Sequence, residues 1–211
     1  MKRAELFHPR VFDDQTWAEG YYQRNKKNIA RVGKRLAKLL TDKDLKNARI
    51  LDVGCGFASV PIEMARVIPD ANIIGIDPGE PLLNIGRELI AKAGYSNCIK
   101  LKSGDAHHLD FKDNTFDVVI NTFLLHIIED PVQMLNEIER VTKPEGYILI
   151  TDLRRGFLAY FIRKFRTAYT SFEAKQVIEQ SGIRHGKMTN GPFWWDYMVL
   201  NESNLICEEA V

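Results

Sequence analysis

The sequence predicts an α/β fold in which a mostly parallel sheet is covered by helices on both faces. Two observations support it: short apolar runs alternate with helix-forming segments at least four times, and the first run ends abruptly in a glycine-rich turn. Buried parallel strands read as short runs of branched apolar residues, joined by helical crossovers. We therefore expect a doubly wound, seven-stranded sheet whose last hairpin includes an antiparallel edge strand.

The composition is that of an ordinary globular domain. Of 211 residues, 45% are hydrophobic and 27% charged, and the formal net charge is +1. This balance attracts neither nucleic acid nor anionic membranes over the whole surface. Cys55, Cys98 and Cys207 are too few and too scattered for a disulfide framework or a zinc site. Neither a signal peptide nor a membrane span of ~18 apolar residues is evident. We expect a cytoplasmic protein with no metal, no nucleic-acid partner and no stable membrane insertion.

The chain opens with a helix and a strand. Ile29, Val32 and Leu36 recur at helical spacing, so an amphipathic helix is expected over about 15–40. The apolar run at 48–54 predicts the first strand.

Prolines and a glycine bound the next elements. Pro61 suits the first turn of a helix that ends near Pro69, and 73–77 reads as the second strand. Pro81 suits the first turn of a further helix, and Gly94 suits its end.

Three more strands complete the parallel part. The runs at 99–103 and 116–123 predict the third and fourth strands, and 146–151 predicts the fifth. Asp130 and Pro131 supply the cap and first turn of the helix before the fifth strand.

The tail has a different pattern. A helix is expected near 171–182, followed by strands at 184–189 and 194–201. The turn Asn190-Gly191-Pro192 joins these strands into a hairpin at the sheet edge.

Glycines and acidic residues stand where the first three strands end. Gly54 and Gly56 follow the first strand, and Asp77 and Asp105 follow the second and third. Ligands of open α/β sheets bind beyond the carboxyl ends of the strands. Glycine lets the backbone approach a ligand, and the next helix offers free N–H groups at its N-terminus. We expect a nucleotide-sized pocket here.

Five segments stand in register along the chain: 51–56, 75–77, 103–106, 116–119 and 143–147. Together they resemble the class I S-adenosylmethionine-dependent methyltransferases, whose fold is Rossmann-like. The resemblance is closest to the small-molecule branch, with the ubiquinone/menaquinone-type and methyltransferase type 11 families. It implies transfer of a methyl group from S-adenosylmethionine to a small organic acceptor.

The resemblance also implies roles for individual residues. Gly54 and Gly56 would lie against the methionine half of the cofactor, with Asp52 near its amino group. Asp77 would hold the ribose hydroxyls, and Asp105 would accept from the adenine amino group. The implied cofactor-binding set is Asp52, Gly54, Gly56, Asp77, Asp105, Ala106 and Asn121.

A nicotinamide or flavin dinucleotide is the rival cofactor. Its fingerprint places a third glycine three positions after the second, for close packing of helix on strand. Ser59 occupies that position, and the turn has no basic residue for a pyrophosphate. S-adenosylmethionine is therefore favoured.

Candidate acceptor-binding residues lie on three segments. His126 follows the fourth strand and is either a base or a histidine held by local hydrogen bonds. Tyr21 and Tyr22 either line the acceptor pocket from a lid or pack on the sheet. Phe157 and Phe161 belong to the aromatic and basic segment 154–166, which reads as a helix. This segment is a cap over the acceptor, a shallow membrane contact or a dimer face.

These expectations combine into one domain. Residues 1–44 form a helical lid, 45–153 the cofactor-binding core, and 154–211 the acceptor-pocket insertion and edge hairpin. The expected partner is a small-molecule acceptor, with a homodimer possible. Two alternatives stay open: a module that binds the cofactor without catalysis, and a methyltransferase acting on protein or tRNA.

Overall fold

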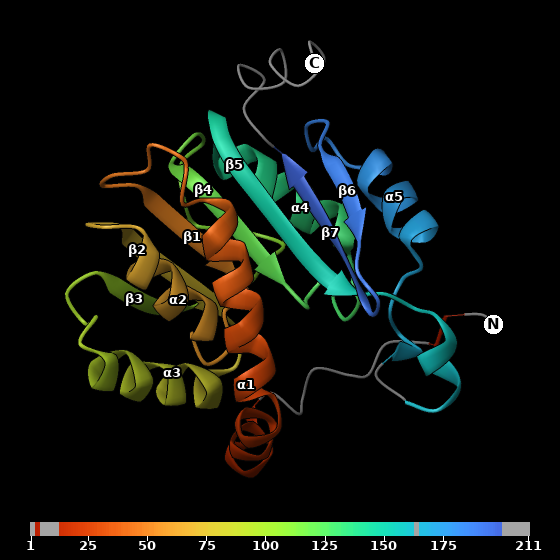
Figure 1. Cartoon of the computed structure of the whole chain (residues 1–211), viewed down its shortest axis with the longest axis horizontal. Coiled ribbons are helices and arrows are strands. Elements are labelled where there is room, and N and C mark those ends of the chain that lie inside the picture. Colours follow the sequence, from red (N-terminus) through yellow and green to blue (C-terminus); the bar gives the residue numbers. More distant parts are fainter. Residues whose placement is uncertain (1–2, 5–12, 163–164, 200–211) are drawn as a thin grey trace. The chain divides into compact units, whose positions relative to one another are not determined.

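The computed structural model describes residues 3–4, 13–162 and 165–199 (Figure 1). The chain forms two compact units, His8–Asp110 and the remainder, Met1–Phe7 with Phe111–Val211. Within the described ranges, no helix has both the length and the apolar character needed to cross a bilayer.

The unit His8–Asp110 contains three parallel strands with helices between them. Its elements are α1 (Gln15–Leu39), β1 (Arg49–Val53), α2 (Ser59–Val67), β2 (Asn72–Asp77), α3 (Glu80–Ala93) and β3 (Ile99–Ser103). β2 lies between β1 and β3 and pairs in parallel with both. The expected positions of all six elements are confirmed to within a few residues.

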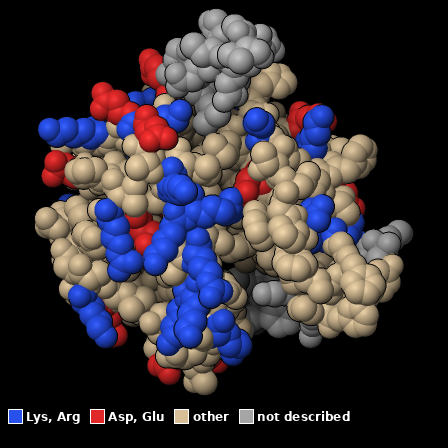
Figure 2. Space-filling view, viewed as in Figure 1, with Lys and Arg blue, Asp and Glu red and all other residues tan. Residues whose placement is uncertain are grey.

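The ends of these helices follow from their sequence. The Asp14 side chain accepts from the Trp17 N–H and caps α1, and Gly94 ends α3 with φ of 80°. A left-handed glycine is a common helix stop. Figure 2 shows Lys and Arg atoms in a band over α1.

An aromatic cluster fixes α1 to the turn after β1. The ring of Phe57, which is 1% exposed, lies 5.1 Å from the ring of Tyr22 and 6.0 Å from that of Tyr21. Trp17 stacks on Tyr21 at 5.1 Å, and Leu82 of α3 belongs to the same cluster. Burying such rings contributes several kcal/mol and edge-to-face contacts add to it.

The second unit contains the remaining four strands. Its elements are β4 (Phe116–Thr122), α4 (Pro131–Val141), β5 (Thr142–Leu153), the 3₁₀ helix η2 (Phe157–Tyr160), α5 (Ser171–Gln180), β6 (Lys187–Asn190) and β7 (Trp194–Val199). β4 and β5 are parallel, and β7 runs antiparallel between β5 and β6. The strand order is β3-β2-β1-β4-β5-β7-β6, which confirms the predicted seven-stranded, mostly parallel α/β fold.

The fifth strand begins earlier than predicted. Phe116 pairs with Thr142 and Val118 pairs with Tyr147, so the residues between Thr142 and Tyr147 are accommodated as an irregularity in the pairing. The strand thus extends back to Thr142, with its regular pairing to β4 starting at Tyr147.

The prediction of a helix over 154–166 is wrong: the described residues of this segment form no α-helix, and only short 3₁₀ stretches such as η2. Competing backbone contacts explain the difference. The N–H of Arg154 donates to the carbonyl of Phe193, and the N–H of Arg155 donates to that of Tyr169. These bonds hold the start of the segment extended, and Gly156 continues it with φ of −155°.

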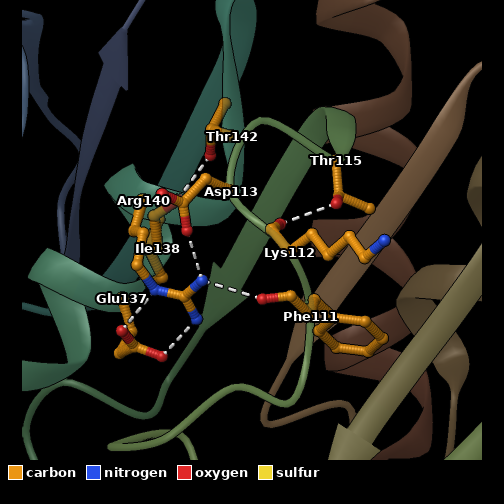
Figure 3. Close-up of polar contacts among 8 residues, drawn as sticks. All are labelled: Phe111, Lys112, Asp113, Thr115, Glu137, Ile138, Arg140 and Thr142. Carbon is orange, nitrogen blue, oxygen red and sulfur yellow. Dashed lines mark hydrogen bonds and ion pairs between the residues drawn. The ribbon is translucent and has the colours of Figure 1, made fainter.

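Arg140 joins the end of α4 to the loop before β4 (Figure 3). Its guanidinium lies 2.7 Å from Glu137 Oε1 and 2.8 Å from Asp113 Oδ1, and it donates to the carbonyl of Phe111 at 2.8 Å. The hydrogen bonds to Glu137 and then Asp113 raise the pKa of Arg140 above its ordinary value. One side chain thus links a helix to a segment more than 20 residues earlier.

Arg140→Ala is expected to lower the free energy of unfolding by about 1–2 kcal/mol, since it removes several charge-assisted hydrogen bonds in a partly shielded place. Chemical denaturation measures this change. Arg87→Ala is the control, because Arg87 and its partner Glu80 are 43% and 52% exposed, and such a pair contributes about 0.5 kcal/mol or less. Equal losses in the two variants would contradict a special role for Arg140.

Candidate cofactor site

The turn between β1 and α2 is a tight loop anchored on β2. Gly54 and Gly56 have φ of 78° and 50°, in the left-handed region that favours glycine. The N–H groups of Gly54 and Cys55 both donate to the carbonyl of Ile76 at 2.9 Å. A Cβ built on Gly56 would meet nothing within 4 Å, so the space beside this backbone is open.

Asp77 closes the same loop from the end of β2. Its Oδ2 accepts from the N–H of Gly56 and its Oδ1 from the N–H of Gly79, both at 2.9 Å. Burial raises the pKa of Asp77, and the two backbone hydrogen bonds oppose that rise. Each carboxylate oxygen retains acceptor capacity beyond one hydrogen bond, so Asp77 is able to accept hydroxyl groups as well.

Asp52, near the end of β1, has a buried carboxyl group without hydrogen-bond donors in the part of the chain that the structure describes. Its side chain is 1% exposed, and neither carboxylate oxygen has a hydrogen-bond donor among the described residues. Burial, and then the negative charge of Asp77, raise the pKa of Asp52 to about 8. A buried carboxylate without donors is costly. A cationic amino group would supply both charge and donors, so this site fits the amino-acid end of S-adenosylmethionine.

The third strand adds Asp105 and Ala106. The N–H of Gly104 donates to the carbonyl of Asp77 at 3.3 Å, which joins this turn to β2. The carboxylate of Asp105 is 67% exposed and accepts from the N–H of His107 at 2.9 Å. This hydrogen bond and the imidazole of His107 lower the pKa of Asp105, so the group stays an acceptor. Ala106 is buried.

The structure therefore brings six predicted cofactor residues together at the carboxyl ends of β1, β2 and β3. Parallel pairing aligns these ends, with Val53 opposite Ile76 and Asp77 opposite Ser103. The six residues are Asp52, Gly54, Gly56, Asp77, Asp105 and Ala106.

Tyr21 and Tyr22 contact the loop rather than the sheet. Both rings pack edge-on against Phe57, the residue that follows Gly56. The aromatic face of α1 thus covers the glycine-rich turn. Acceptor binding by the two tyrosines stays a prediction.

Asn121 and His126 belong to the other unit. Asn121 is fully buried near the end of β4, and its Nδ2 donates to the Met134 sulfur at 3.7 Å. His126 Nδ1 lies 2.6 Å from Asp152 Oδ1, and the His126 N–H donates to Asp152 Oδ2 at 2.8 Å. Cofactor contact by Asn121 and catalysis by His126 stay predictions.

Asp152 is the residue that the sequence analysis did not single out. It is fully buried, accepts a hydrogen bond from the His126 backbone N–H, and places Oδ1 2.6 Å from His126 Nδ1, a nitrogen that makes no hydrogen bond with the described residues. A signal was present, because Asp152 stands at the end of a buried strand, as Asp77 does. A carboxylate that fixes the ring of a histidine is a common support for proton transfer.

The loop and acidic strand ends define a nucleoside-binding domain of the Rossmann-like class. Residues 44–190 match the family model described as a methyltransferase domain, and the chain belongs to that family. The predicted class, the class I S-adenosylmethionine-dependent methyltransferases, is thereby confirmed.

Relatives agree with this assignment. The chain is 36% identical to a demethylmenaquinone methyltransferase of Listeria monocytogenes over 148 residues, which are 66% of this chain and 62% of the relative. It is 38% identical to an uncharacterized methyltransferase of Schizosaccharomyces pombe over 109 residues, or 49% and 39% of the two chains. The matches thus span less than two thirds of either relative.

Solved structures share the fold. A SAM-dependent methyltransferase from Aquifex aeolicus superposes with a TM-score of 0.71 at 22% identity, covering 88% of this chain and 97% of that one. Phosphoethanolamine N-methyltransferase 2 of Haemonchus contortus, in complex with S-adenosyl-L-methionine, gives 0.71 at 15% identity, covering 89% and 57%. At such identities the likeness concerns the fold alone.

Proposed function

We propose that this chain transfers the methyl group of S-adenosylmethionine to a small organic acceptor. The observation that carries the proposal is the buried carboxylate of Asp52, which lacks donors beside an open glycine-rich loop. Family membership supports the same activity. The two acidic strand ends suit a ligand with an ammonium group and ribose hydroxyls.

The chain's own groups position and shield the reactants. Asp52 pairs with the ammonium group, Asp77 accepts from the ribose, and the Gly54–Gly56 turn lets the backbone approach. When bound, the cofactor supplies an activated sulfonium methyl group for displacement. The aromatic face of α1 packs on Phe57 beside the glycine-rich turn and would help to shield a bound cofactor from water. His126, whose ring lies beside the carboxylate of Asp152, would remove an acceptor proton where the acceptor needs a base.

An apolar ring compound is the acceptor class that we favour. This choice follows several relatives that bear the name demethylmenaquinone methyltransferase. The predicted homodimer and cytoplasmic location stay predictions.

Incubation with methyl-labelled S-adenosylmethionine and a cell extract tests the proposal. Label should enter an organic-soluble small molecule. Label in protein or RNA alone would mean that the acceptor is a macromolecule. Cofactor binding without any transfer would mean that the chain is a non-catalytic module. Absence of cofactor binding in calorimetry would end the proposal.

Gly56→Ala is expected to reduce cofactor affinity more than stability. The added methyl group meets no protein atom within 4 Å, so the folded state bears mainly the left-handed backbone cost of about 1–2 kcal/mol. The same methyl group occupies space that we assign to the cofactor. Thermal unfolding with and without S-adenosylmethionine separates the two effects, and Gly94→Ala, with φ of 80° at a helix end away from the loop, is the control. Equal stabilisation of both variants by the cofactor would contradict this placement.

A further inference from the structure

The segment around η2 exposes a group of large apolar side chains. Phe157 is 75% exposed, Tyr160 61%, Phe161 71% and Ile162 40%; we call these four residues the aromatic patch. The Phe157 ring lies 5.2 Å from the Phe161 ring and 6.2 Å from the Tyr160 ring, so the patch is contiguous. Surface aromatics gathered in this way mark an interaction site.

The patch stands on an anchored base. Ala159 is fully buried and Phe165 is 6% exposed, and the Phe165 ring lies 6.5 Å from that of Phe193. Arg166 Nε donates to the carbonyl of Ala159 at 3.1 Å, and the Ala4 N–H donates to the carbonyl of Arg166. The exposed rings therefore stand on a segment that is held to its own unit.

The charged residues around the patch are basic. Residues 154–169 contain five Lys or Arg and no Asp or Glu. Arg154 and Arg166 use carbonyl oxygens as partners, those of Pro192 and of Ala159 and Tyr160. Carbonyl partners leave the positive charge in place, whereas Arg155 pairs with Glu173. Figure 2 shows uncharged surface over the η2 region with blue atoms beside it.

We propose that the aromatic patch, flanked by Arg154 and Arg166, docks this unit on the surface of an anionic phospholipid bilayer. Aromatic rings favour the membrane–water interface, and each basic residue near an anionic surface adds to the affinity. This local charge acts where the overall charge of +1 gives no attraction.

The charge around the aromatic patch and the exposure of its rings argue against two other occupants, a second copy of the chain and a small acceptor. A second copy would bring a positive rim against a positive rim in a symmetric contact. The three rings, which are 61–75% exposed, would enclose a small acceptor only if the segment closed over that acceptor. A bilayer satisfies both the apolar and the basic groups as they stand.

Flotation with vesicles tests the docking on the full chain. The protein should float with vesicles of phosphatidylcholine and phosphatidylglycerol, and much less with phosphatidylcholine alone. Phe157→Ser with Phe161→Ser should lower the partition coefficient at least about tenfold, and Phe161→Trp should preserve it. Arg154→Gln with Arg166→Gln should lower it about fivefold per residue on anionic vesicles only. Leu39→Ser with Val67→Ser, exposed apolar residues of the other unit at 38% and 36%, is the control and should bind normally.

Three outcomes would overturn the docking. The first is no flotation of the native protein. The second is equal binding by the serine double variant and the native protein. The third is a concentration-dependent dimer that the serine variant abolishes without vesicles. Calorimetry of S-adenosylmethionine binding runs in parallel, so failure to dock with intact cofactor binding refutes this inference alone. Absence of cofactor binding by the native protein would instead refute the proposed function.

Discussion

Replacing Asp77 with alanine is expected to weaken S-adenosylmethionine binding by about 10- to 150-fold, since a hydrogen bond to a charged group contributes about 1.5–3 kcal/mol. The structure gives Asp77 two tasks. Its carboxylate accepts from the N–H groups of Gly56 and Gly79, and we assign it the ribose hydroxyls. The variant thus loses direct contacts and loosens the loop.

Titration calorimetry on the folded variants measures the effect. Glu88→Ala is the matched control, because Glu88 is an exposed carboxylate on α3 of the same unit. Asp77→Asn should fall between the native protein and Asp77→Ala, since an amide has only one oxygen to accept from two backbone donors. Native affinity in Asp77→Ala would remove Asp77 from the site.

Much of the fold was predictable because its signals are local. Pro61, Pro81 and Pro131 mark first turns of helices, and Gly94 marks a helix end, as the structure confirms. The six residues of the loop and strand ends follow from one further rule, that parallel strands share a carboxyl edge.

The parts that were not predictable depend on distant contacts. His126 meets Asp152 from 26 positions away, and nothing in either local sequence specifies that pairing. Segment 154–166 has the periodicity of a helix, but Phe193 and Tyr169 compete for its backbone N–H groups. From the sequence, Tyr21 and Tyr22 could be assigned to a lid or to the sheet. Their contact with Phe57 in the turn after β1 forms only when α1 packs on that turn.

Asp52→Asn is expected to stabilise the ligand-free protein at alkaline pH by several kcal/mol. The pKa of Asp52 rises from 3.8 to about 8 in the folded state, so the folded protein holds a proton that the unfolded chain has released. The stability that the proton on Asp52 contributes is therefore fully present below the unfolded pKa of 3.8, and it is lost as pH rises toward the folded pKa of about 8. Asparagine resembles the protonated carboxyl group and cannot ionise, so the variant escapes this loss.

Thermal and chemical unfolding between about pH 5 and pH 9 measures the difference, which should widen as pH rises through the window set by this pKa shift. Glu88→Gln, at an exposed carboxylate on α3 of the same unit, is the control and should keep the pH dependence of the native protein. A native protein whose stability does not fall with pH more steeply than that of Asp52→Asn would contradict a shifted Asp52.

The same substitution should weaken cofactor binding, because asparagine offers an ammonium group no negative charge. Stability and function then move in opposite directions at one residue. A buried carboxyl group kept without donors in the ligand-free protein is explained if it ionises and pairs with a cationic ligand, and the cofactor should stabilise the native protein more than Asp52→Asn. Equal stabilisation by S-adenosylmethionine in both proteins would mean that the charge of Asp52 serves something other than this ligand.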